Sequence, residues 1–481
     1  MRLFHDQLVE RVALDPHKVA ASDDFGPVSR IEFLKRIAGL AQALPPGRRV
    51  VGLLAPNGVD WAAAQFAAAF AGKTVVPLPT YFSQGQIAHI VRDASVDFIW
   101  FSQGLSPSLA NRGIDAAPLA PTGESPGIEC VDGFQQIIYT SGTTGQPKGV
   151  RHGAPQIAWV SQALAACTHA SEQDLYLSVL PLPTLLETIC AVFIPALVGG
   201  QVRFAPSASD AVGRGLAPPL ADLFESVRPT ASVLVPQLLK AYVAQLVASG
   251  RRAPDNLRFV AVGGASTPPA TAAAARRLGI PVHEGYGLSE CCSVVALAEA
   301  DGRSAGSVGR PLQGLNVSIE EGEIVVEGPS VTDGYLGRSN HSGPWRTGDL
   351  GEFDETGRLR ILGRRDNMLV TSMGRNVSPE WIEALLLADF KVAQCALTCD
   401  AEGELAMLVI PSAFGSEWFA RASQAVLDSW VLDACAAAPS YARPNATFVV
   451  AAGDAVANGL LTGSGGINRK RVAAFAKSRP R

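Results

Sequence analysis

The segment of this sequence best suited to chemistry is a loop rich in glycine and hydroxyl groups, residues 139–149 (YTSGTTGQPKG). Its three glycines let the backbone approach a ligand closely and turn N–H groups inward, and four Ser or Thr hydroxyls add further donors. Lys148 adds a positive charge. Phosphate is the ligand that this combination favours, because each of these groups stabilises an anion. The residues that we expect at the phosphates are Thr140, Ser141, Gly142, Thr143, Thr144, Gly145 and Lys148.

Two other short segments match phosphate-binding or hydrolase motifs only in part. Residues 72–74 (GKT) end like a Walker A loop, but Ala67 stands where that motif has its first glycine. Residues 123–127 (GESPG) fit G-x-S-x-G, but Pro126 removes a backbone N–H that the oxyanion hole needs. The sequence therefore favours neither a P-loop nucleotidase nor a serine hydrolase.

Alternating helical and strand-like segments surround the phosphate loop and would position it. An apolar, β-prone stretch at 134–139 leads directly into the loop. The alternation favours parallel strands joined by crossover helices. Residues 111–133 are rich in Pro, Gly and Ala and predict an irregular connection. We expect helices at 30–44 and 60–71, and strands at 49–54, 74–78, 257–262, 323–327 and 358–362.

The pattern changes after residue 363. Ser378 is a plausible N-cap, and Pro379 would occupy the first position of an amphipathic helix. Strands are expected at 394–398, 405–410 and 447–450, with another helix at 417–437. We therefore predict an α/β fold with a large N-terminal domain of mostly parallel sheets and flanking helices (1–365) and a small α+β C-terminal domain (366–481).

Composition excludes several classes of function. Forty basic and 44 acidic side chains give a net charge of −4, so no basic excess is present to hold nucleic acid. The N-terminal residues lack the apolar region of a signal peptide, and the most apolar stretch, 185–200, is too short to span a bilayer. The eight cysteines do not form paired C-x2-C motifs, which argues against a zinc site. A cytoplasmic protein without a membrane span is expected.

Seven further motifs follow the loop along the chain: LPL (180–182), GGA (263–265), GYGLSE (285–290), GRP (309–311), WRTGD (345–349), GRRD (363–366) and NVSP (376–379). Together with the loop they resemble the superfamily of adenylate-forming enzymes, which comprises acyl-CoA synthetases, adenylation domains and luciferases. The resemblance covers nearly the whole chain, and the ordered set is specific. In motif spelling the chain is closest to fatty-acyl-CoA synthetases.

The resemblance implies roles for particular residues. Thr140 and Glu290 match the positions that hold Mg²⁺, an ion that prefers hard oxygen ligands. Tyr286 is expected beside adenine, and Asp349 matches the aspartate that binds the ribose. Asp366 matches a hinge about which the small domain is mobile. The remaining nucleotide-binding residues are Gly264, Ala265, Glu284, Gly287 and Ser289, and the catalytic residues are Lys148, Glu290 and Arg364.

The activity that the resemblance implies is AMP-forming ligation of a small carboxylic acid, with ATP and Mg²⁺, to a thiol. Coenzyme A is the expected acceptor, and the phosphopantetheine of an acyl carrier protein is the alternative. The small, apolar residues near Thr184, 235–237 and 263–266 favour a fatty or aryl acid. One departure leaves another alternative open, because Gly466 stands where the family has a catalytic lysine. The chain would then be an adenylate-binding homologue with impaired adenylation.

Overall fold

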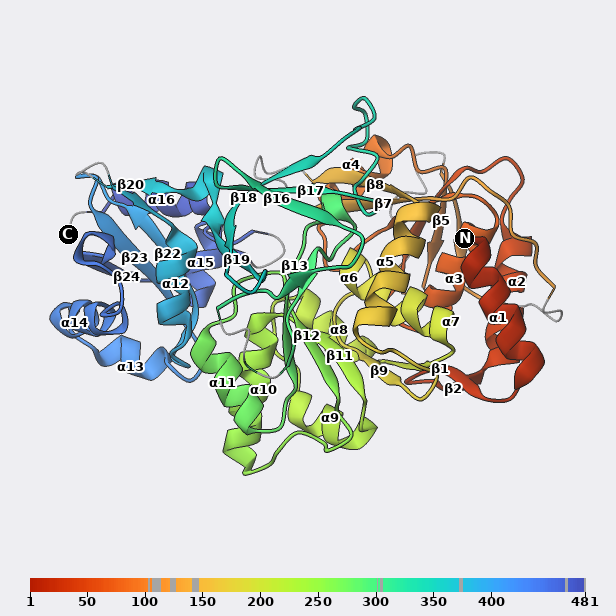
Figure 1. The fold of residues 1–481 in the computed structure, drawn as a ribbon, viewed down its shortest axis with the longest axis horizontal. Coiled ribbons are helices and arrows are strands. Elements are labelled where there is room, and N and C mark those ends of the chain that lie inside the picture. The colour runs from red at the N-terminus through yellow and green to blue at the C-terminus, as the bar shows by residue number, and fades with distance from the viewer. Residues whose placement is uncertain are drawn as a thin grey trace.

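The molecule consists of a large N-terminal part and a smaller C-terminal domain, which lie at opposite ends of its longest axis in Figure 1. The computed structural model describes residues 1–102, 104–105, 114–121, 127–140, 147–300, 302, 306–371, 375–462 and 466–479. Within these ranges, no helix is long and apolar enough to cross a bilayer. The predicted α/β class is confirmed.

The larger of two mostly parallel sheets has nine strands within the described residues. Its six central strands are parallel, and antiparallel strands complete both edges. In spatial order the strands are β15 (Arg310–Pro311), β14 (Ala296–Leu297), β13 (Val282–Tyr286), β12 (Phe259–Val262), β11 (Ala231–Leu234), β9 (Leu175–Ser178), β10 (Gln201–Phe204), β1 (Val19–Asp23) and β2 (Gly26–Ser29).

The second sheet has six strands and delivers the phosphate loop. Its first five strands are parallel, whereas β8 returns antiparallel to β7. In spatial order they are β6 (Asp115–Pro118), β5 (Phe98–Phe101), β3 (Val50–Leu54), β4 (Thr74–Pro77), β7 (Gln135–Thr140) and β8 (Lys148–Gly153).

Helices cover both sheets, and one of them belongs to the core. Helix α3 is apolar on all sides, and eleven of its twelve residues are buried, as expected for a helix surrounded by protein. It shares one apolar cluster with residues of β3 and β9, so the two sheets have a common core. The N-terminal helices are α1 (Arg2–Leu14), α2 (Arg30–Ala43), α3 (Val59–Phe70), α4 (Gln84–Asp93), α5 (Ala154–Cys167), α6 (Leu185–Thr188), the π-helical turn η2 (Ile189–Phe193), α7 (Ile194–Val198), α8 (Pro206–Gly213), α9 (Leu220–Val227), α10 (Pro236–Ser249) and α11 (Pro269–Arg277).

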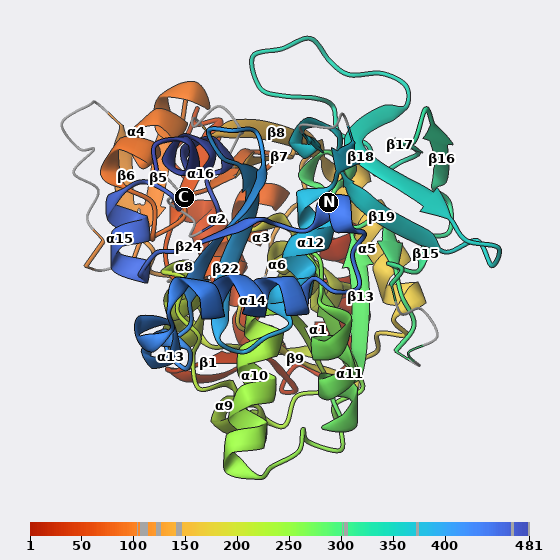
Figure 2. The same ribbon diagram turned by 90° about the vertical axis from the view of Figure 1, so that its left-hand side faces the viewer.

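A four-stranded antiparallel sheet stands beside these layers and leads into the C-terminal domain (Figure 2). Its strands are β16 (Asn316–Glu320), β17 (Glu323–Glu327), β18 (Trp345–Phe353) and β19 (Leu359–Arg364). The C-terminal domain has its own apolar clusters around β22 (Val392–Cys399), β23 (Leu405–Pro411) and β24 (Ala446–Val449). Its other elements are β20 (Leu369–Val370), β21 (Asn376–Val377), α12 (Pro379–Leu387), α13 (Ser416–Arg421), α14 (Gln424–Ala434), α15 (Ala452–Ala457) and α16 (Arg469–Lys477).

Two local expectations need correction. The stretch 111–133 is not wholly irregular, because β6 pairs with β5 at the edge of the sheet, where a strand ending in Pro118 is tolerated. The helix expected at 417–437 is two helices, α13 and α14, interrupted at Ala422 and Ser423, both of which are extended. The prediction that Ser378 is the N-cap of α12 with Pro379 at the first helical position is confirmed, and the Ser378 hydroxyl donates to the Glu380 carboxylate.

Candidate active site

The hairpin of β7 and β8 presents the two ends of the phosphate loop. Thr140 is the last residue of β7 and lies directly opposite Lys148, the first residue of β8. The loop residues expected at the phosphates, Ser141, Gly142, Thr143, Thr144 and Gly145, lie outside the described residues. The described part of the site therefore begins with the two residues that flank this loop.

Lys148 and Glu290 both contact Tyr335. The Tyr335 hydroxyl donates a hydrogen bond of 2.6 Å to Oε1 of Glu290, and Nζ of Lys148 lies 5.9 Å from the centre of the Tyr335 ring. The Arg338 guanidinium lies 5.5 Å from the same ring. The backbone fixes this arrangement, because Leu336 N–H donates to the carbonyl of Gly149 at 2.8 Å. Two cations and one carboxylate thus surround one aromatic ring beside the phosphate loop.

Tyr286, Asp349 and Arg364 form a second cluster. The Tyr286 hydroxyl donates to Oδ2 of Asp349 at 2.7 Å, and Nε of Arg364 lies 3.0 Å from Oδ1 of the same carboxylate. Asp349 and Arg364 are opposite residues of β18 and β19. Burial raises the pKa of Asp349, although its two partners stabilise the charged form. Burial and then the charge of Asp349 raise the pKa of Tyr286, so its hydroxyl keeps its proton.

The turns after β12 and β13 provide close backbone approach. Gly264 follows β12 with a φ of +85°, in the left-handed region that glycine adopts at no steric cost, and Ala265 beside it is exposed. A Cβ on Gly287 would lie 1.7 Å from the carbonyl oxygen of Ser293, so this position requires glycine. Ser289 begins the short 3₁₀ turn that carries Glu290. The Glu284 carboxylate forms an ion pair with Arg276 of α11 at 3.5 Å.

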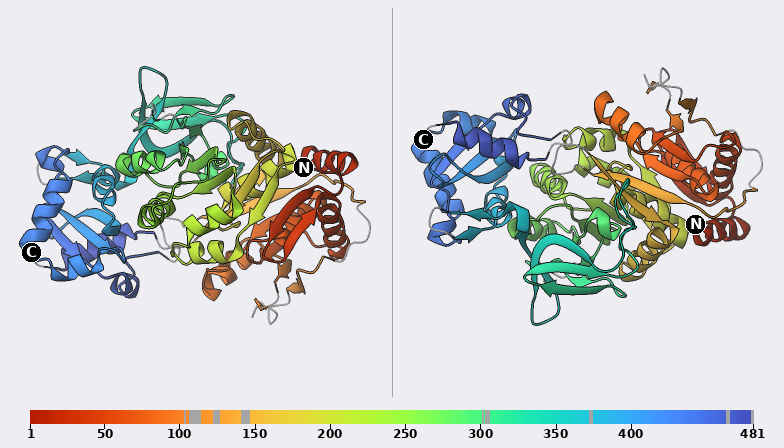
Figure 3. Two further views of the ribbon diagram at one scale, coloured as in Figure 1. Left: turned by 90° about the horizontal axis from the view of Figure 1, so that it is seen from below. Right: turned by 90° about the horizontal axis from the view of Figure 1, so that it is seen from above.

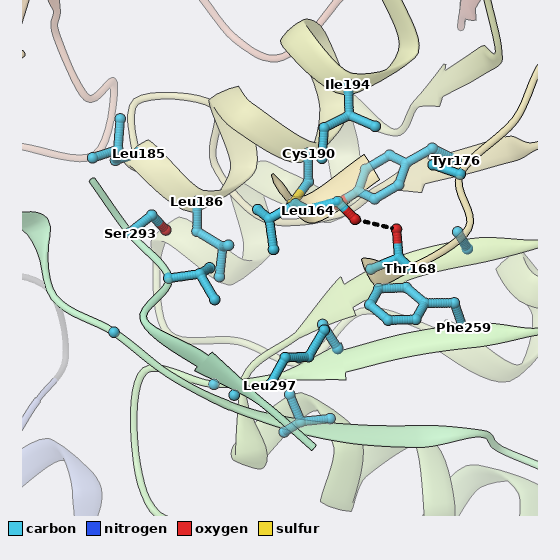
Figure 4. A pocket seen from close by; sticks show the side chains of 18 of the residues that line it. Leu164, Thr168, Tyr176, Leu185, Leu186, Cys190, Ile194, Phe259, Ser293 and Leu297 are labelled. Carbon is cyan, nitrogen blue, oxygen red and sulfur yellow. Dashed lines mark hydrogen bonds between the residues drawn. The ribbon is translucent and has the colours of Figure 1, made fainter. Parts of the chain in front are cut away.

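A cavity of about 270 Å³, which we call the acid cavity, adjoins these turns. Gly264, Tyr286 and Gly287 line one part of it, and apolar side chains form most of the remaining wall. Figure 4 shows Leu164, Leu186, Cys190, Ile194 and Leu297 around the cavity, with Leu185 and Ser293 at one side and Thr168 and Phe259 at the other. Thr184 lines it as expected from the sequence. This space suits an apolar ligand adjacent to the Tyr286 cluster.

Gly466 lies near the end of the C-terminal domain, in a turn closed by hydrogen bonds. Thr462 N–H donates to the Gly466 carbonyl at 2.7 Å, and Gly466 N–H donates to Oγ1 of Thr462 at 3.1 Å. In Figure 3 the dark-blue segments on either side of residues 463–465 extend from the C-terminal domain toward the N-terminal part. Arg469 cannot replace a lysine at this turn without breaking its ion pairs, because its guanidinium binds both oxygens of Glu383 at 2.8 Å and also contacts Glu380.

Sequence reasoning missed several residues of the site. Tyr335 follows a glycine in residues 332–338 (TDGYLGR), a pattern common in turns, so its contact with Glu290 had no clear signal. The buried pair of Tyr176 and Glu187, joined at 3.0 Å, was also unassigned. Asp174 and Arg258 meet at the wall of the acid cavity although 84 residues separate them in sequence. Only the fold brings such partners together.

Comparison with known proteins adds a family and a set of relatives. A family model described as AMP-binding enzyme matches residues 8–336. A 2-succinylbenzoate–CoA ligase of Geobacillus sp. (strain WCH70) is 28% identical over 420 residues, covering 81% of this chain and 83% of the relative.

Two solved structures show how far the fold is shared. The o-succinylbenzoate coenzyme A synthetase of Bacillus subtilis, in complex with ATP and magnesium ion, matches with a TM-score of 0.80 and 23% identity, covering 96% of this chain and 98% of that one. The anthranilate CoA ligase AuaEII, in complex with anthranoyl-AMP, matches with a TM-score of 0.84 and 19% identity, covering 99% and 97%. Identities this low establish similarity of fold.

Proposed function

Because the chain belongs to the family of AMP-binding enzymes, we propose that it is an AMP-forming acid–CoA ligase acting on an aryl acid. The observation that carries the proposal is that Tyr286 of one cluster lines the apolar acid cavity, and that Ser289, next to Glu290 of the other cluster, lines it as well. Tyr286, Asp349 and Arg364 offer a ring, a carboxylate and a cation suited to a nucleoside. Lys148 and Glu290 stand at the mouth of the phosphate loop.

In the first half-reaction a carboxylate oxygen of the acid attacks the α-phosphorus of ATP. A new P–O bond forms, the bond to the β-phosphate oxygen breaks, and pyrophosphate leaves. Lys148 neutralises part of the phosphate charge during this step, and Asp349 holds the ribose hydroxyls. Tyr286 lies beside the base and, through its hydroxyl, keeps Asp349 oriented. The acid cavity holds the acyl tail and excludes water from the reacting carboxylate.

Thr140 and Glu290 supply the oxygens expected of a magnesium site. Magnesium usually keeps several waters and binds one or two protein oxygens together with the phosphates of a nucleotide, so a hydroxyl and one carboxylate fit it. Bound there, it would neutralise charge on the triphosphate. Tyr335 holds the Glu290 carboxylate in a fixed position for this role.

In the second half-reaction the sulfur of coenzyme A attacks the acyl carbonyl carbon and forms the thioester C–S bond. The bond from that carbon to the phosphate oxygen breaks, AMP leaves, and the thiol proton is released. A thiol needs a route to this carbon that differs from the route of pyrophosphate. We propose that the C-terminal domain, residues 366–481, turns relative to residues 1–365 between the two steps, with Asp366 as the hinge. Asp366 lies in the 3₁₀ turn Arg365–Asn367 that links β19 to this domain.

The names of the relatives bear on the substrate and the acceptor. Both 2-succinylbenzoate and anthranilate are aryl acids, and both names specify CoA. They give no support to the expected role in fatty acid metabolism, to a carrier-protein acceptor, or to a homologue impaired in adenylation. An aryl acid and CoA are therefore the first substrates to test.

The test is ATP–pyrophosphate exchange dependent on an added acid, followed by CoA-dependent release of AMP. We expect exchange with at least one aryl acid, and a loss of about 10²- to 10³-fold in Glu290→Gln. Glu352→Gln changes an exposed glutamate of β18 and serves as the matched control. Absence of acid-dependent exchange across aryl and alkyl acids would overturn the proposed function.

A further inference from the structure

The acid cavity carries charge at one place. Among the described residues that line it, Asp174 and Arg258 are the two with charged side chains. Arg258 donates to the Thr168 carbonyl and directly precedes Phe259, so the pair lies at that part of the wall. Figure 4 shows Thr168 and Phe259 on the side of the cavity away from Leu185 and Ser293. Any second charge on an acid bound in this cavity would have to be balanced there.

Arg258 has its donors engaged by the protein. Its Nε donates to Oδ1 of Asp174 at 2.7 Å, and Nη2 donates to Oδ2 of the same carboxylate. Its Nη1 donates to the backbone carbonyl of Thr168 at 2.7 Å. This bidentate geometry is the strongest form of an arginine–carboxylate contact. The guanidinium therefore offers no uncompensated positive charge to a ligand.

Asp174 is held as firmly as its partner. Its carboxylate also accepts hydrogen bonds from the Thr230 hydroxyl at 2.7 Å and from the Ser171 backbone N–H at 2.8 Å. Burial alone would raise the pKa of Asp174, but the bonds from Arg258, Thr230 and Ser171 outweigh burial and hold it below its ordinary value. The pair stays ionised and neutral as a unit, so a ligand carboxylate would gain Arg258 only by displacing Asp174.

Three hydroxyls of the cavity wall, those of Thr168, Thr184 and Tyr176, are engaged as well. Thr168 donates to the Leu164 carbonyl at 2.7 Å, the contact drawn in Figure 4, and Thr184 donates to the Pro181 carbonyl at 2.8 Å. The Tyr176 hydroxyl donates to Oε2 of Glu187 at 3.0 Å, so an acidic group rather than a cation stands behind this wall. Each of these three hydroxyls already donates to an acceptor within the protein, so none of them needs an acceptor on the ligand.

Burying a carboxylate without a partner is strongly unfavourable, whereas an apolar tail gains from leaving water. We propose that the acid cavity selects acids whose tail is uncharged and apolar and discriminates against acids with a second carboxylate, 2-succinylbenzoate included. This inference rests on the proposed function. The acid cavity has a volume of about 270 Å³ and so holds roughly nine groups of the size of a water, at about 30 Å³ each. This volume suits an aryl ring with a short chain.

The decisive comparison uses two acids that differ by one group. The acid 4-oxo-4-phenylbutanoate has the skeleton of 2-succinylbenzoate without the ring carboxylate. Both acids, together with octanoate as an alkyl arm, are converted to acyl-sulfamoyladenosines, in which a sulfamate replaces the phosphate. Calorimetry then measures their binding to the full chain without requiring turnover.

We expect the 4-oxo-4-phenylbutanoyl compound to bind at least about 100-fold more tightly than the 2-succinylbenzoyl compound. Tighter binding of the octanoyl compound than of the aryl one would support the inference and identify an alkyl tail. Equal binding of the aryl pair, or a preference for the second carboxylate, would overturn the inference and leave the proposed function intact. Failure of all three compounds to bind would overturn both.

A charge-switch variant gives an independent readout. Asp174→Asn leaves Arg258 without its counter-charge, so the preference against the second carboxylate should shrink at least about tenfold. Asp222→Asn, which disrupts an exposed aspartate–arginine pair with Arg251, is the matched control and should leave the preference unchanged. Unchanged selectivity in a folded Asp174→Asn protein would count against the role of this ion pair.

Discussion

The hydroxyl of Tyr335 lies 2.6 Å from Oε1 of Glu290 and donates to it. Because Tyr335 also pairs with Val150 of β8, this bond links the turn after β13 to β8. Burial, and next the hydrogen bond to Glu290, raise the pKa of Tyr335, so the hydroxyl stays protonated and acts as a donor. Glu290 is thereby held in one orientation before a nucleotide arrives. Under the proposed function this orientation preorganises the magnesium site.

Tyr335→Phe removes the donor and keeps the ring beside Lys148 and Arg338. A hydrogen bond to a charged group contributes about 1.5–3 kcal/mol, so we expect acid-dependent pyrophosphate exchange to fall about 10- to 100-fold. The Mg²⁺ concentration for half-maximal rate should rise. Tyr441→Phe, at an exposed tyrosine of the C-terminal domain, is the control. A normal magnesium dependence in Tyr335→Phe would show that this contact does not position Glu290.

Local patterns in the sequence predict the main elements of this fold because they depend on near neighbours. Residues 134–139 are apolar and β-prone, and β7 forms there. The sequence motifs also single out Asp349 and Arg364 as candidate site residues. The pairing register of β18 and β19 then places these two residues opposite each other. Contacts such as Tyr335 with Glu290 or Asp174 with Arg258 depend on how distant elements pack, and no local pattern encodes that packing. Glu284, whose motif implies a nucleotide contact, also forms an ion pair with Arg276 that no local pattern indicates.

The buried carboxyl of Glu187 predicts a pH dependence of stability. Burial raises its pKa from an ordinary value of 4.5 to about 8. Below pH 4.5 the group is protonated in both folded and unfolded states. Between 4.5 and about 8 the unfolded chain ionises while the folded one stays protonated, so stability falls as pH rises, by up to about 1.4 kcal/mol per pH unit.

Glu187→Gln should remove this slope, because an amide stays neutral and its oxygen can still accept from Tyr176. The measurement is the thermal unfolding temperature of both proteins from pH 5 to 8. Relative to the variant, the wild-type protein should lose stability steadily over this range. Parallel curves for the two proteins would mean that Glu187 does not change its ionisation on folding. Glu352→Gln, at an exposed site, controls for the loss of one acidic group.

Lys240 joins the N-terminal part to the C-terminal domain. Its ammonium group, on α10, donates to three backbone carbonyls at and after the end of α12, those of Leu387, Asp389 and Val392, at 2.8, 2.6 and 2.9 Å. Lys240→Met keeps an unbranched side chain of similar length and removes the donors. If the C-terminal domain turns between the two half-reactions, destabilising the pose in which Lys240 makes these bonds should change the rate of one half-reaction relative to the other.

We expect the rates of adenylation and of thioester formation in Lys240→Met to change in opposite directions, by about threefold or more each. Pyrophosphate exchange measures the first, and CoA-dependent AMP release from a preformed acyl-adenylate measures the second. Lys477→Met, at an exposed lysine of α16, is the control. An equal fall in both rates would point to general destabilisation and against a role in domain placement.

The turn at Gly466 can accept the lysine that the family resemblance leads one to expect there. Among the described residues, a Cβ at this position meets only Oγ1 of Thr462, at 3.4 Å, which is ordinary contact, and the backbone does not require glycine. One preorganised donor at the reacting phosphate changes rates by about 10²- to 10³-fold. We therefore expect Gly466→Lys to raise acid-dependent pyrophosphate exchange at least about tenfold and to leave thioester formation from preformed acyl-adenylate unchanged. Gly453→Lys, in α15 with open space around its Cβ, adds the same charge to the same domain as a control. Equal exchange in wild type and Gly466→Lys would mean that residues already present in the chain supply this charge.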